Sequence, residues 1–193
     1  MVDQKKRIFL QTYGDSLTEG YPYSPLKSWP TFVGHHFGIP VVCSAENGRT
    51  MLEMVRDKER DLSGFHPAYV TLMGGTNDFY NSMESEFVFM NMLALVDWVE
   101  AHGSIPVICL PPPSLDLEIE VALEKYREDL REWAMKKKKM LLDFDFLFRD
   151  ESGNILEKFF ADSCHPNEEG YQKMGQQGII FFQPLFEKWQ EKN

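Results

Sequence analysis

The sequence predicts an α/β fold, a doubly wound sandwich in which helices cover both faces of a parallel sheet. Short apolar runs alternate with longer amphipathic stretches through the whole chain, which is the pattern of strand-helix-strand units. The apolar runs are short and contain few polar residues, as expected for parallel strands covered on both faces. No linker, repeat or low-complexity segment interrupts the 193 residues, so residues 1–193 are expected to form a single domain.

Five strands are expected. They lie at about Arg7–Thr12, Pro40–Ser44, Ala68–Met73, Ile105–Leu110 and Met140–Phe144. For five parallel strands the default order in such a sheet is 2-1-3-4-5. Residues Asp150–Asn154 have the composition of a surface turn between the last strand and the closing segment. All five carboxyl ends then lie on one rim of the sheet, and ligands bind at that rim in this kind of fold.

Five amphipathic helices are expected between and after the strands. They run from Ser28 to Gly38, from Thr50 to about Leu62, from about Ser85 to His102, from about Asp116 to Lys139, and from Asn167 towards Trp189. Ser28 and Asn167 suit helix N-caps, whereas Gly38 and Gly103 suit helix ends. Pro184 is expected to kink or divide the last helix, because proline removes a helical hydrogen bond. Apolar stripes such as Val88, Met92, Leu95, Val96 and Val99 are interpreted as core.

Charge and composition argue against several classes of partner. A net charge of -10 argues against nucleic-acid binding, because phosphate recognition needs basic patches. The one basic run, Lys136–Lys139, falls where a helix should end, and its charges complement the helix dipole. No stretch approaches the length of a membrane span, and the apolar run near the start is too short for a signal peptide. A cytoplasmic protein is therefore expected.

Cysteine and histidine spacing indicates neither disulfides nor a metal site. Cys43, Cys109 and Cys164 are an odd count without paired spacing, so neither a disulfide framework nor a zinc site is predicted. The pair His35-His36 and the single His66 lack partners at ligand spacing. Cys164 is interpreted as a small packed residue rather than a redox group.

The end of the first strand is the first candidate for chemistry. Its apolar run breaks at Gly14 and is followed at once by Asp15 and Ser16. A serine just past a strand, on a glycine-containing turn, is well placed as a nucleophile, because its hydroxyl and backbone N–H can face the same ligand. The same residues also suit an ordinary strand-to-helix turn with Ser16 or Thr18 as the N-cap. The residues that follow the other predicted strands distinguish between these two interpretations.

Each predicted strand end carries polar or turn-forming residues. In chain order they are Gly14-Asp15-Ser16-Leu17, Glu46-Asn47-Gly48-Arg49, Gly74-Gly75-Thr76-Asn77-Asp78, Pro111-Pro112-Pro113 and, after a loop, Asp162-Ser163-Cys164-His165-Pro166. Ser16 is a weak nucleophile alone and needs a base. His165 could take its proton and pass it to the leaving group, and Asp162 could hold the imidazole in the right tautomer. This set suits attack on an acyl carbon.

Three donors on the same rim suit the negative charge that such an attack places on the carbonyl oxygen. They are the N–H groups of Ser16 and Gly48 and the side-chain amide of Asn77. Gly48 fits this role because a bare backbone can approach the substrate closely. Asp15 and Asp78 are interpreted as structural carboxylates that accept backbone N–H bonds and hold turns.

These residues resemble the GDSL, or SGNH, family of hydrolases. Gly14–Leu17 matches the family's first block, Gly48 lies where the second block places its glycine, Gly75–Asp78 matches the Gly-x-Asn-Asp of the third, and Asp162–His165 matches the Asp-x-x-His of the fifth. The resemblance spans residues 7 to about 175. It implies a flavodoxin-like three-layer fold, esterase or lipase chemistry, and no metal or organic cofactor. It implies Ser16 as nucleophile, His165 as base and Asp162 as its partner, with Ser16, Gly48 and Asn77 as oxyanion donors.

The expected activity is hydrolysis of a carboxylic ester or thioester through an acyl-enzyme. Members of the family act on thioesters, lysophospholipids, aryl esters and acetylated sugars, and short-chain acyl or acetyl substrates are expected here. The segments Tyr21–Leu26 and Phe79-Tyr80 could wall an apolar pocket, stack on a sugar, or simply cover the core. The expected partner is a small-molecule substrate. The sequence does not specify an oligomeric state.

Other interpretations explain less of the chain. A flavodoxin-type ligand-binding protein could use Ser16, Thr18 and Gly20 in a phosphate loop. FMN binding, however, does not call for Asn77 or for Asp162 and His165. A catalytically inactive binding domain of the SGNH fold is disfavoured, because every catalytic position carries the required residue type. A response regulator needs an acidic pair after the first strand and a lysine after the fifth, and neither is present.

Overall fold

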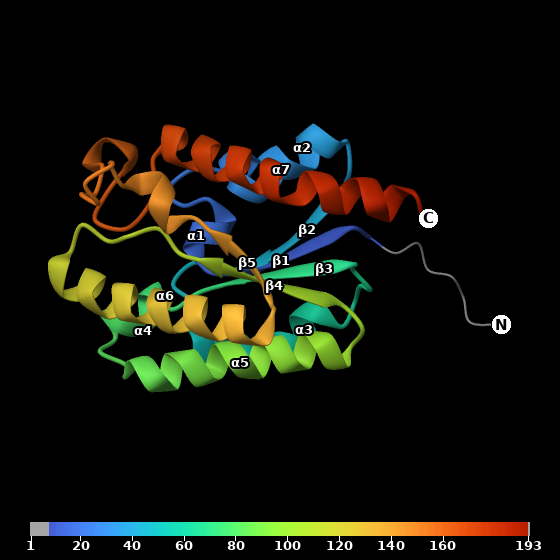
Figure 1. Cartoon of the computed structure of the whole chain (residues 1–193), viewed down its shortest axis with the longest axis horizontal. Helices are drawn as coiled ribbons and strands as arrows, with labels where there is room; N and C mark the ends of the chain where they lie inside the picture. Colours follow the sequence, from blue (N-terminus) through green and yellow to red (C-terminus); the bar gives the residue numbers. More distant parts are fainter. Residues whose placement is uncertain (1–7, 193) are drawn as a thin grey trace.

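The computed structural model describes residues 8–192 and contains a five-stranded parallel sheet (Figure 1). The strands are β1 (Leu10–Gly14), β2 (Val41–Ala45), β3 (Tyr69–Met73), β4 (Ile105–Leu110) and β5 (Met140–Asp143). Their order is β2-β1-β3-β4-β5, and every neighbouring pair is parallel. The predicted fold class and strand order are therefore confirmed.

Helices cover both faces of the sheet and give three layers (Figure 1). One face carries α2 (Trp29–Phe37) and α7 (Glu168–Gln190), and the other carries α3 (Met51–Leu62), α5 (Ser85–Ala101) and α6 (Leu117–Lys137). Two short helices that the sequence did not predict, α1 (Ser16–Glu19) and α4 (Thr76–Tyr80), follow β1 and β3 directly. Within the described residues, each helix is too short or too polar to cross a membrane.

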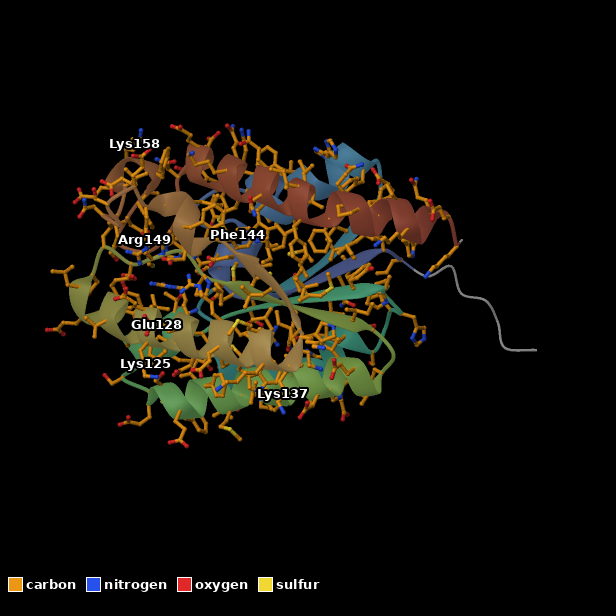
Figure 2. The ribbon with its side chains drawn as sticks, in the orientation of Figure 1. Lys125, Glu128, Lys137, Phe144, Arg149 and Lys158 are labelled. Carbon is orange, nitrogen blue, oxygen red and sulfur yellow. The ribbon has the colours of Figure 1, made fainter. Side chains whose placement is uncertain are left out.

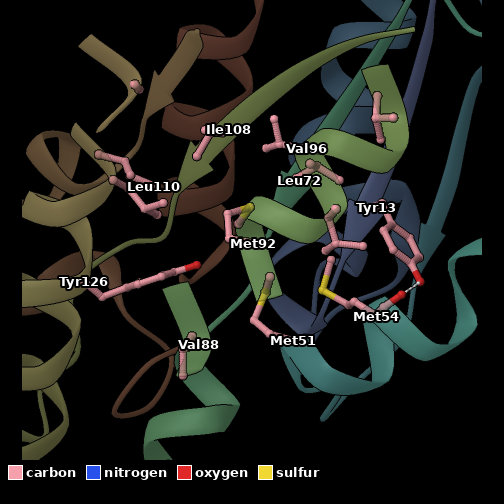
Figure 3. Packing of buried hydrophobic residues seen from close by; sticks show 14 of the residues in the cluster. Tyr13, Met51, Met54, Leu72, Val88, Met92, Val96, Ile108, Leu110 and Tyr126 are labelled. Atoms are coloured by element: carbon pink, nitrogen blue, oxygen red, sulfur yellow. Dashed lines mark hydrogen bonds between the residues drawn. The ribbon is translucent and has the colours of Figure 1, made fainter. Parts of the chain in front are cut away.

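Each face of the sheet packs on its own apolar core. The core under α3, α5 and α6 includes Tyr13, Met51, Met54 and Tyr126 (Figure 3). The Tyr13 hydroxyl donates to the Met54 carbonyl oxygen at 2.7 Å, so this buried phenol has a partner. The predicted stripe on α5 is buried as expected, at Val88, Met92, Leu95, Val96 and Val99. The core under α2 and α7 is rich in aromatic rings packed edge to face.

The first strand begins and ends later in the chain than the sequence predicts. The sequence predicts about Arg7–Thr12, whereas β1 reaches Gly14, and Arg7 lies outside the described residues. Gln11 can be buried inside the strand because its side-chain amide donates to the Ser44 hydroxyl at 3.0 Å. The strand therefore continues through the polar residues Gln11 and Thr12 to Tyr13 and Gly14.

The register of the sheet brings the candidate site together. Gly14, the last residue of β1, pairs with Ala45 at the end of β2 and with Met73 at the end of β3. The chain leaves β1 for β2 on one side and then crosses back to β3 on the other. Residues that follow β1 and β3 therefore lie at the topological switch point, where ligands bind in open parallel sheets.

Most predicted helix ends are found where the sequence places them. The Thr50 hydroxyl and the Glu53 side chain form a capping box at the start of α3. The Asn167 side chain accepts from the Gly170 N–H at 3.0 Å and caps α7. Ser28 is the N-cap residue of α2 as predicted, but its side chain accepts no bond from the helix, and its hydroxyl donates to the Pro25 carbonyl oxygen at 2.7 Å.

Pro184 does not divide the last helix. The sequence predicts a kink or a division there; α7 continues through Pro184 to Gln190, so the helix is not divided. Phe182 and Phe186 lie on either side of the proline and are buried in the same aromatic core. Their packing holds both halves of the helix on one surface, and this outweighs the missing hydrogen bond.

Candidate active site

Ser16 is the first residue of α1 and lies directly beyond β1. Asp15 is the N-cap of this helix, and its Oδ1 accepts from the Leu17 N–H at 3.0 Å. The cap is therefore neither Ser16 nor Thr18, which leaves the Ser16 hydroxyl free for other contacts. A Cβ at Gly14 would lie 2.7 Å from the Met73 carbonyl oxygen, so a side chain there would push the neighbouring strand away.

A hydrogen-bonded chain of three side chains links Ser16, His165 and Asp162. The Ser16 Oγ lies 3.0 Å from the His165 Nε2. On the other side of the ring, Nδ1 lies 2.8 Å from the Asp162 Oδ2 and 3.0 Å from Oδ1. These residues are up to 149 positions apart in the chain, and the structure brings all three together as the sequence predicts.

The loop that carries Asp162 and His165 is held by its own hydrogen bonds. The Asp162 Oδ1 accepts from the backbone N–H of Cys164 at 2.9 Å and of His165 at 2.8 Å. The Ala161 N–H also donates to the His165 carbonyl oxygen at 2.8 Å. Burial raises the pKa of Asp162, but the hydrogen bonds from Cys164 and His165 outweigh this effect and hold the pKa below its usual value. The carboxylate therefore stays ionised beside the imidazole.

Asn77 lies on α4, beyond the end of β3, and reaches the turn that follows β2. Its amide Nδ2 donates to the Arg49 carbonyl oxygen at 3.0 Å and lies 3.5 Å from the Asp15 Oδ2. Gly48 precedes Arg49 in that turn, is exposed, and has a φ of 75°. Its N–H has no hydrogen-bond partner among the described residues. The structure thus places the turn of Gly48 beside Asn77, and Asn77 beside the turn of Ser16.

Two buried carboxylates support these turns. Both oxygens of Asp78 accept from the Met51 N–H, at 2.9 and 3.2 Å, and so fix the start of α3. Burial raises the pKa of Asp78 to about 6. Burial, together with the charge of Asp78, raises the pKa of Asp15 to about 7, although the bond from Leu17 acts in the opposite direction. The predicted structural roles of Asp15 and Asp78 agree with these contacts.

The Asp15→Asn variant is expected to have a flatter dependence of stability on pH. Folding raises the pKa of Asp15 from 3.8 to about 7, so the folded state binds this proton more tightly. The protonated Asp15 therefore stabilises the folded state. This contribution is complete below about pH 4 and is lost as the pH rises to about 7. The free energy of unfolding of the wild type should therefore fall between about pH 4 and pH 7. In Asp15→Asn this fall should be smaller by about 2–4 kcal/mol, measured by urea denaturation at each pH. An unchanged slope would contradict the assignment to Asp15.

Two aromatic residues from distant segments contact the same centre. The Tyr21 ring packs edge-on against the His165 ring, with 4.7 Å between centroids. The Tyr171 hydroxyl donates to the Tyr21 carbonyl oxygen at 2.7 Å and lies 3.4 Å from the carbonyl oxygen of Ser16. Sequence reasoning did not find the role of Tyr171, because a residue on α7 carries no local sign that it contacts the end of β1.

One three-residue cluster among the described residues offers ligand atoms that could hold a metal ion. It consists of Asp162, Cys164 and His165, whose ligand atoms lie within 4.8 Å of one another. The Cys164 Sγ lies 3.5 Å from the His165 Nδ1. Burial, with the charge of Asp162, raises the pKa of this thiol to about 12, so it stays protonated at neutral pH. Asp162 and His165 also belong to the chain of hydrogen bonds that ends on Ser16.

A family model and several solved structures match this chain. The model of the GDSL-like lipase/acylhydrolase family matches residues 12–173. A lipolytic protein of the G-D-S-L family from Desulfitobacterium hafniense has a TM-score of 0.83 and 26% identity, over 91% of this chain and 99% of that one. A member of the same family from Veillonella parvula has a TM-score of 0.81 and 21% identity, over 91% and 98%.

A more distant fold neighbour is an acetylxylan esterase from Geobacillus stearothermophilus. Its TM-score is 0.77 and its identity is 16%, over 90% of this chain and 93% of that one. A comparison with curated proteins finds no matching sequence. The family match covers most of the chain, from within β1 to the first turns of α7, and includes each residue of the hydrogen-bonded site. The chain therefore belongs to the GDSL-like lipase/acylhydrolase family.

Proposed function

We propose that this hydrolase cleaves a short-chain carboxylic ester or thioester through an acyl-enzyme on Ser16. The observation that carries the proposal is the unbroken chain of hydrogen bonds from Ser16 through His165 to Asp162. Residues 1–193 would act as one catalytic domain, since the site draws on segments from β1 to the start of α7.

The proposed acylation starts with attack of the Ser16 Oγ on the acyl carbon. His165 Nε2 takes the Ser16 proton as the new C–O bond forms. The bond to the leaving group then breaks, and the leaving oxygen or sulfur receives that proton from His165. In deacylation, water attacks the acyl-enzyme, His165 takes the proton of the water, and the carboxylic acid leaves as Ser16 regains its hydrogen. Asp162 keeps the imidazole in the tautomer that accepts at Nε2 and stabilises its cation.

The oxyanion that forms in each step would be met by the N–H groups of Ser16 and Gly48 and by the Asn77 amide. Support comes from the Gly48 N–H, which lacks a partner among the described residues, and from the bond that ties Asn77 to the same turn. Losing one such donor typically reduces turnover by about 10²–10³-fold.

For the acyl group, we take two tyrosines beside the Asp162–His165 loop as aromatic walls of a site for a short chain. Tyr21 packs directly on the His165 ring, and the Tyr80 hydroxyl lies 3.1 Å from the hydroxyl of Ser163, next to Asp162. Both tyrosines are partly exposed, at 45% and 40%. The fold also accommodates acetyl removal, since the Geobacillus neighbour is an acetylxylan esterase.

The experiment is a panel of p-nitrophenyl esters with acyl chains from acetyl to palmitoyl, together with acetyl and longer-chain thioesters. We expect kcat/KM to be highest for the shortest acyl groups and to fall as the chain lengthens. A preference for long chains would contradict the short-chain proposal while leaving ester hydrolysis intact. Absence of turnover on every compound would contradict the hydrolase proposal.

A further inference from the structure

Ser163 lies between Asp162 and the Cys164-His165 pair, and it connects their loop to the segment that follows β4 and to α4. Its carbonyl oxygen accepts from the Leu115 N–H at 2.7 Å and from the Ser114 hydroxyl at 3.2 Å. The Tyr80 hydroxyl lies 3.1 Å from the Ser163 hydroxyl and 3.4 Å from that of Ser114. We call these contacts among Tyr80, Ser114, Leu115 and Ser163 the Ser163 clamp.

The segment that brings Ser114 to the Ser163 clamp is buried, and its backbone is restricted. It follows β4 and begins with Pro111, Pro112 and Pro113, all of them buried. Proline fixes its own φ, so the direction in which the chain leaves β4 is restricted. Ser114 is fully buried, and its N–H donates to the Glu120 Oε2 at 2.8 Å. Its hydroxyl oxygen accepts from the Asp116 N–H at 3.1 Å, so both polar groups of Ser114 are held.

Glu120 is in turn fixed by two arginines. It is buried on the first turns of α6, where its Oε1 accepts from the guanidinium groups of Arg127 and Arg149. Arg127 lies two turns further along the same helix and is completely buried. Arg149, labelled in Figure 2, comes from the segment after β5 and also donates to the Gly153 carbonyl oxygen at 3.1 Å. A buried carboxylate with two charged partners has little freedom to move.

We infer that Ser114 and Glu120 are positioning residues for the Asp162–His165 loop. Glu120 fixes Ser114, and Ser114 with Leu115 fixes the Ser163 carbonyl, one residue from Asp162 and two from His165. The inference rests on the proposed function, because the reaction is what makes the loop position matter. A displacement of about 1 Å between reacting groups can cost about 10²-fold in rate, so a loosened clamp should reduce turnover.

The test is the Ser114→Ala variant, which removes one donor to the Ser163 carbonyl and leaves the Leu115 N–H in place. We expect kcat for p-nitrophenyl acetate to fall by about 10-fold with KM within about twofold, because the loop position affects the reacting groups more than substrate binding. Ser114→Thr keeps the hydroxyl and should recover most of this loss. Glu120→Gln should lower kcat more than Ser114→Ala does. If Glu120→Gln does not fold, the comparison of Ser114→Ala with Ser114→Thr tests the positioning role by itself.

Two control variants separate positioning from general loosening. Ser104 lies at the opposite end of β4, and its hydroxyl also donates to a distant carbonyl, that of Pro67, at 2.8 Å. Asp116 caps α6, so Asp116→Ala disturbs the helix start without removing a bond to Ser163. We expect Ser104→Ala and Asp116→Ala to retain kcat within about twofold. An equal loss in Asp116→Ala and Ser114→Ala would overturn the inference, because the start of α6 would then be the cause.

A readout that needs no substrate distinguishes this inference from the proposed function. The imidazole resonances of His165 in NMR spectra, identified by their absence in His165→Ala, report the contact between Nδ1 and Asp162. We expect Ser114→Ala to shift or broaden them and Ser104→Ala to leave them unchanged. If Ser114→Ala shifts the His165 resonances but the wild type shows no turnover, the proposed function alone is overturned. If Ser114→Ala leaves both the resonances and kcat unchanged, the positioning role alone is overturned.

Discussion

Replacing Ser16 with alanine is expected to reduce kcat for p-nitrophenyl acetate by about 10⁵-fold, to the level set by the remaining groups of the site. The variant lacks the Oγ that lies 3.0 Å from the His165 Nε2, so no acyl-enzyme can form. Stability should change little, because the side chain is small and the helix cap is Asp15 rather than Ser16. The measurement is p-nitrophenol release by wild type and variant, with burst kinetics to detect the acyl-enzyme.

The neighbouring thiol supplies the matched control for this prediction. The Cys164 Sγ lies 3.5 Å from the His165 Nδ1, but the raised pKa of this thiol keeps it protonated. Cys164→Ala should therefore retain kcat within about 10-fold, whereas Ser16→Ala should not. Equal rates in the wild type and Ser16→Ala would mean that the nucleophile is elsewhere or that the activity comes from a contaminant. A loss confined to Cys164→Ala would assign the chemistry to the thiol.

The fold was predictable because its determinants are local. Apolar runs mark the strands, and caps such as Thr50 and Asn167 mark helix starts within one residue. The exceptions occur where tertiary contacts override local preference. β1 continues past the predicted Thr12 to Gly14, because Gly14 pairs with Ala45 and Met73 on the neighbouring strands. Pro184 stays inside a helix, and the flanking aromatic rings share one core.

The candidate site was predictable for a different reason. Its residues sit at strand ends, and a parallel sheet brings those ends to one rim whatever the details of packing. The residues that support the site have no such marker. Tyr171 reaches back to Ser16 across 155 positions, and Glu120 pairs with Arg149 across 29. These partners follow from the packing of whole elements, so a single sequence does not reveal them.

The Asp162→Asn variant is expected to lose about 10³-fold in kcat, although the two side chains have nearly the same shape. The reason lies in the backbone of the loop. Oδ1 of Asp162 accepts from the N–H groups of Cys164 and His165, so an amide at this position must keep its oxygen there. Its NH₂ group then replaces Oδ2, which lies 2.8 Å from the His165 Nδ1. A donor facing Nδ1 makes that nitrogen an acceptor and places the ring proton on Nε2. Nε2 then donates to Ser16 and cannot take its proton.

The matched control for this second prediction is Asp150→Asn. Asp150 also holds a turn through Oδ1, which accepts from the N–H groups of Ser152 and Asn154 at 2.9 Å each. It differs in having no imidazole beside it, so its replacement tests the loss of a carboxylate that holds a turn. Asp150→Asn should retain the wild-type kcat. The KM of Asp150→Asn and the KM of Asp162→Asn should be equal. If Asp162→Asn also retained wild-type kcat, the His165 tautomer would not depend on the carboxylate, and Asp162 would serve only to hold the loop. If both variants lost activity together, the cause would be loosened turns rather than a misplaced proton.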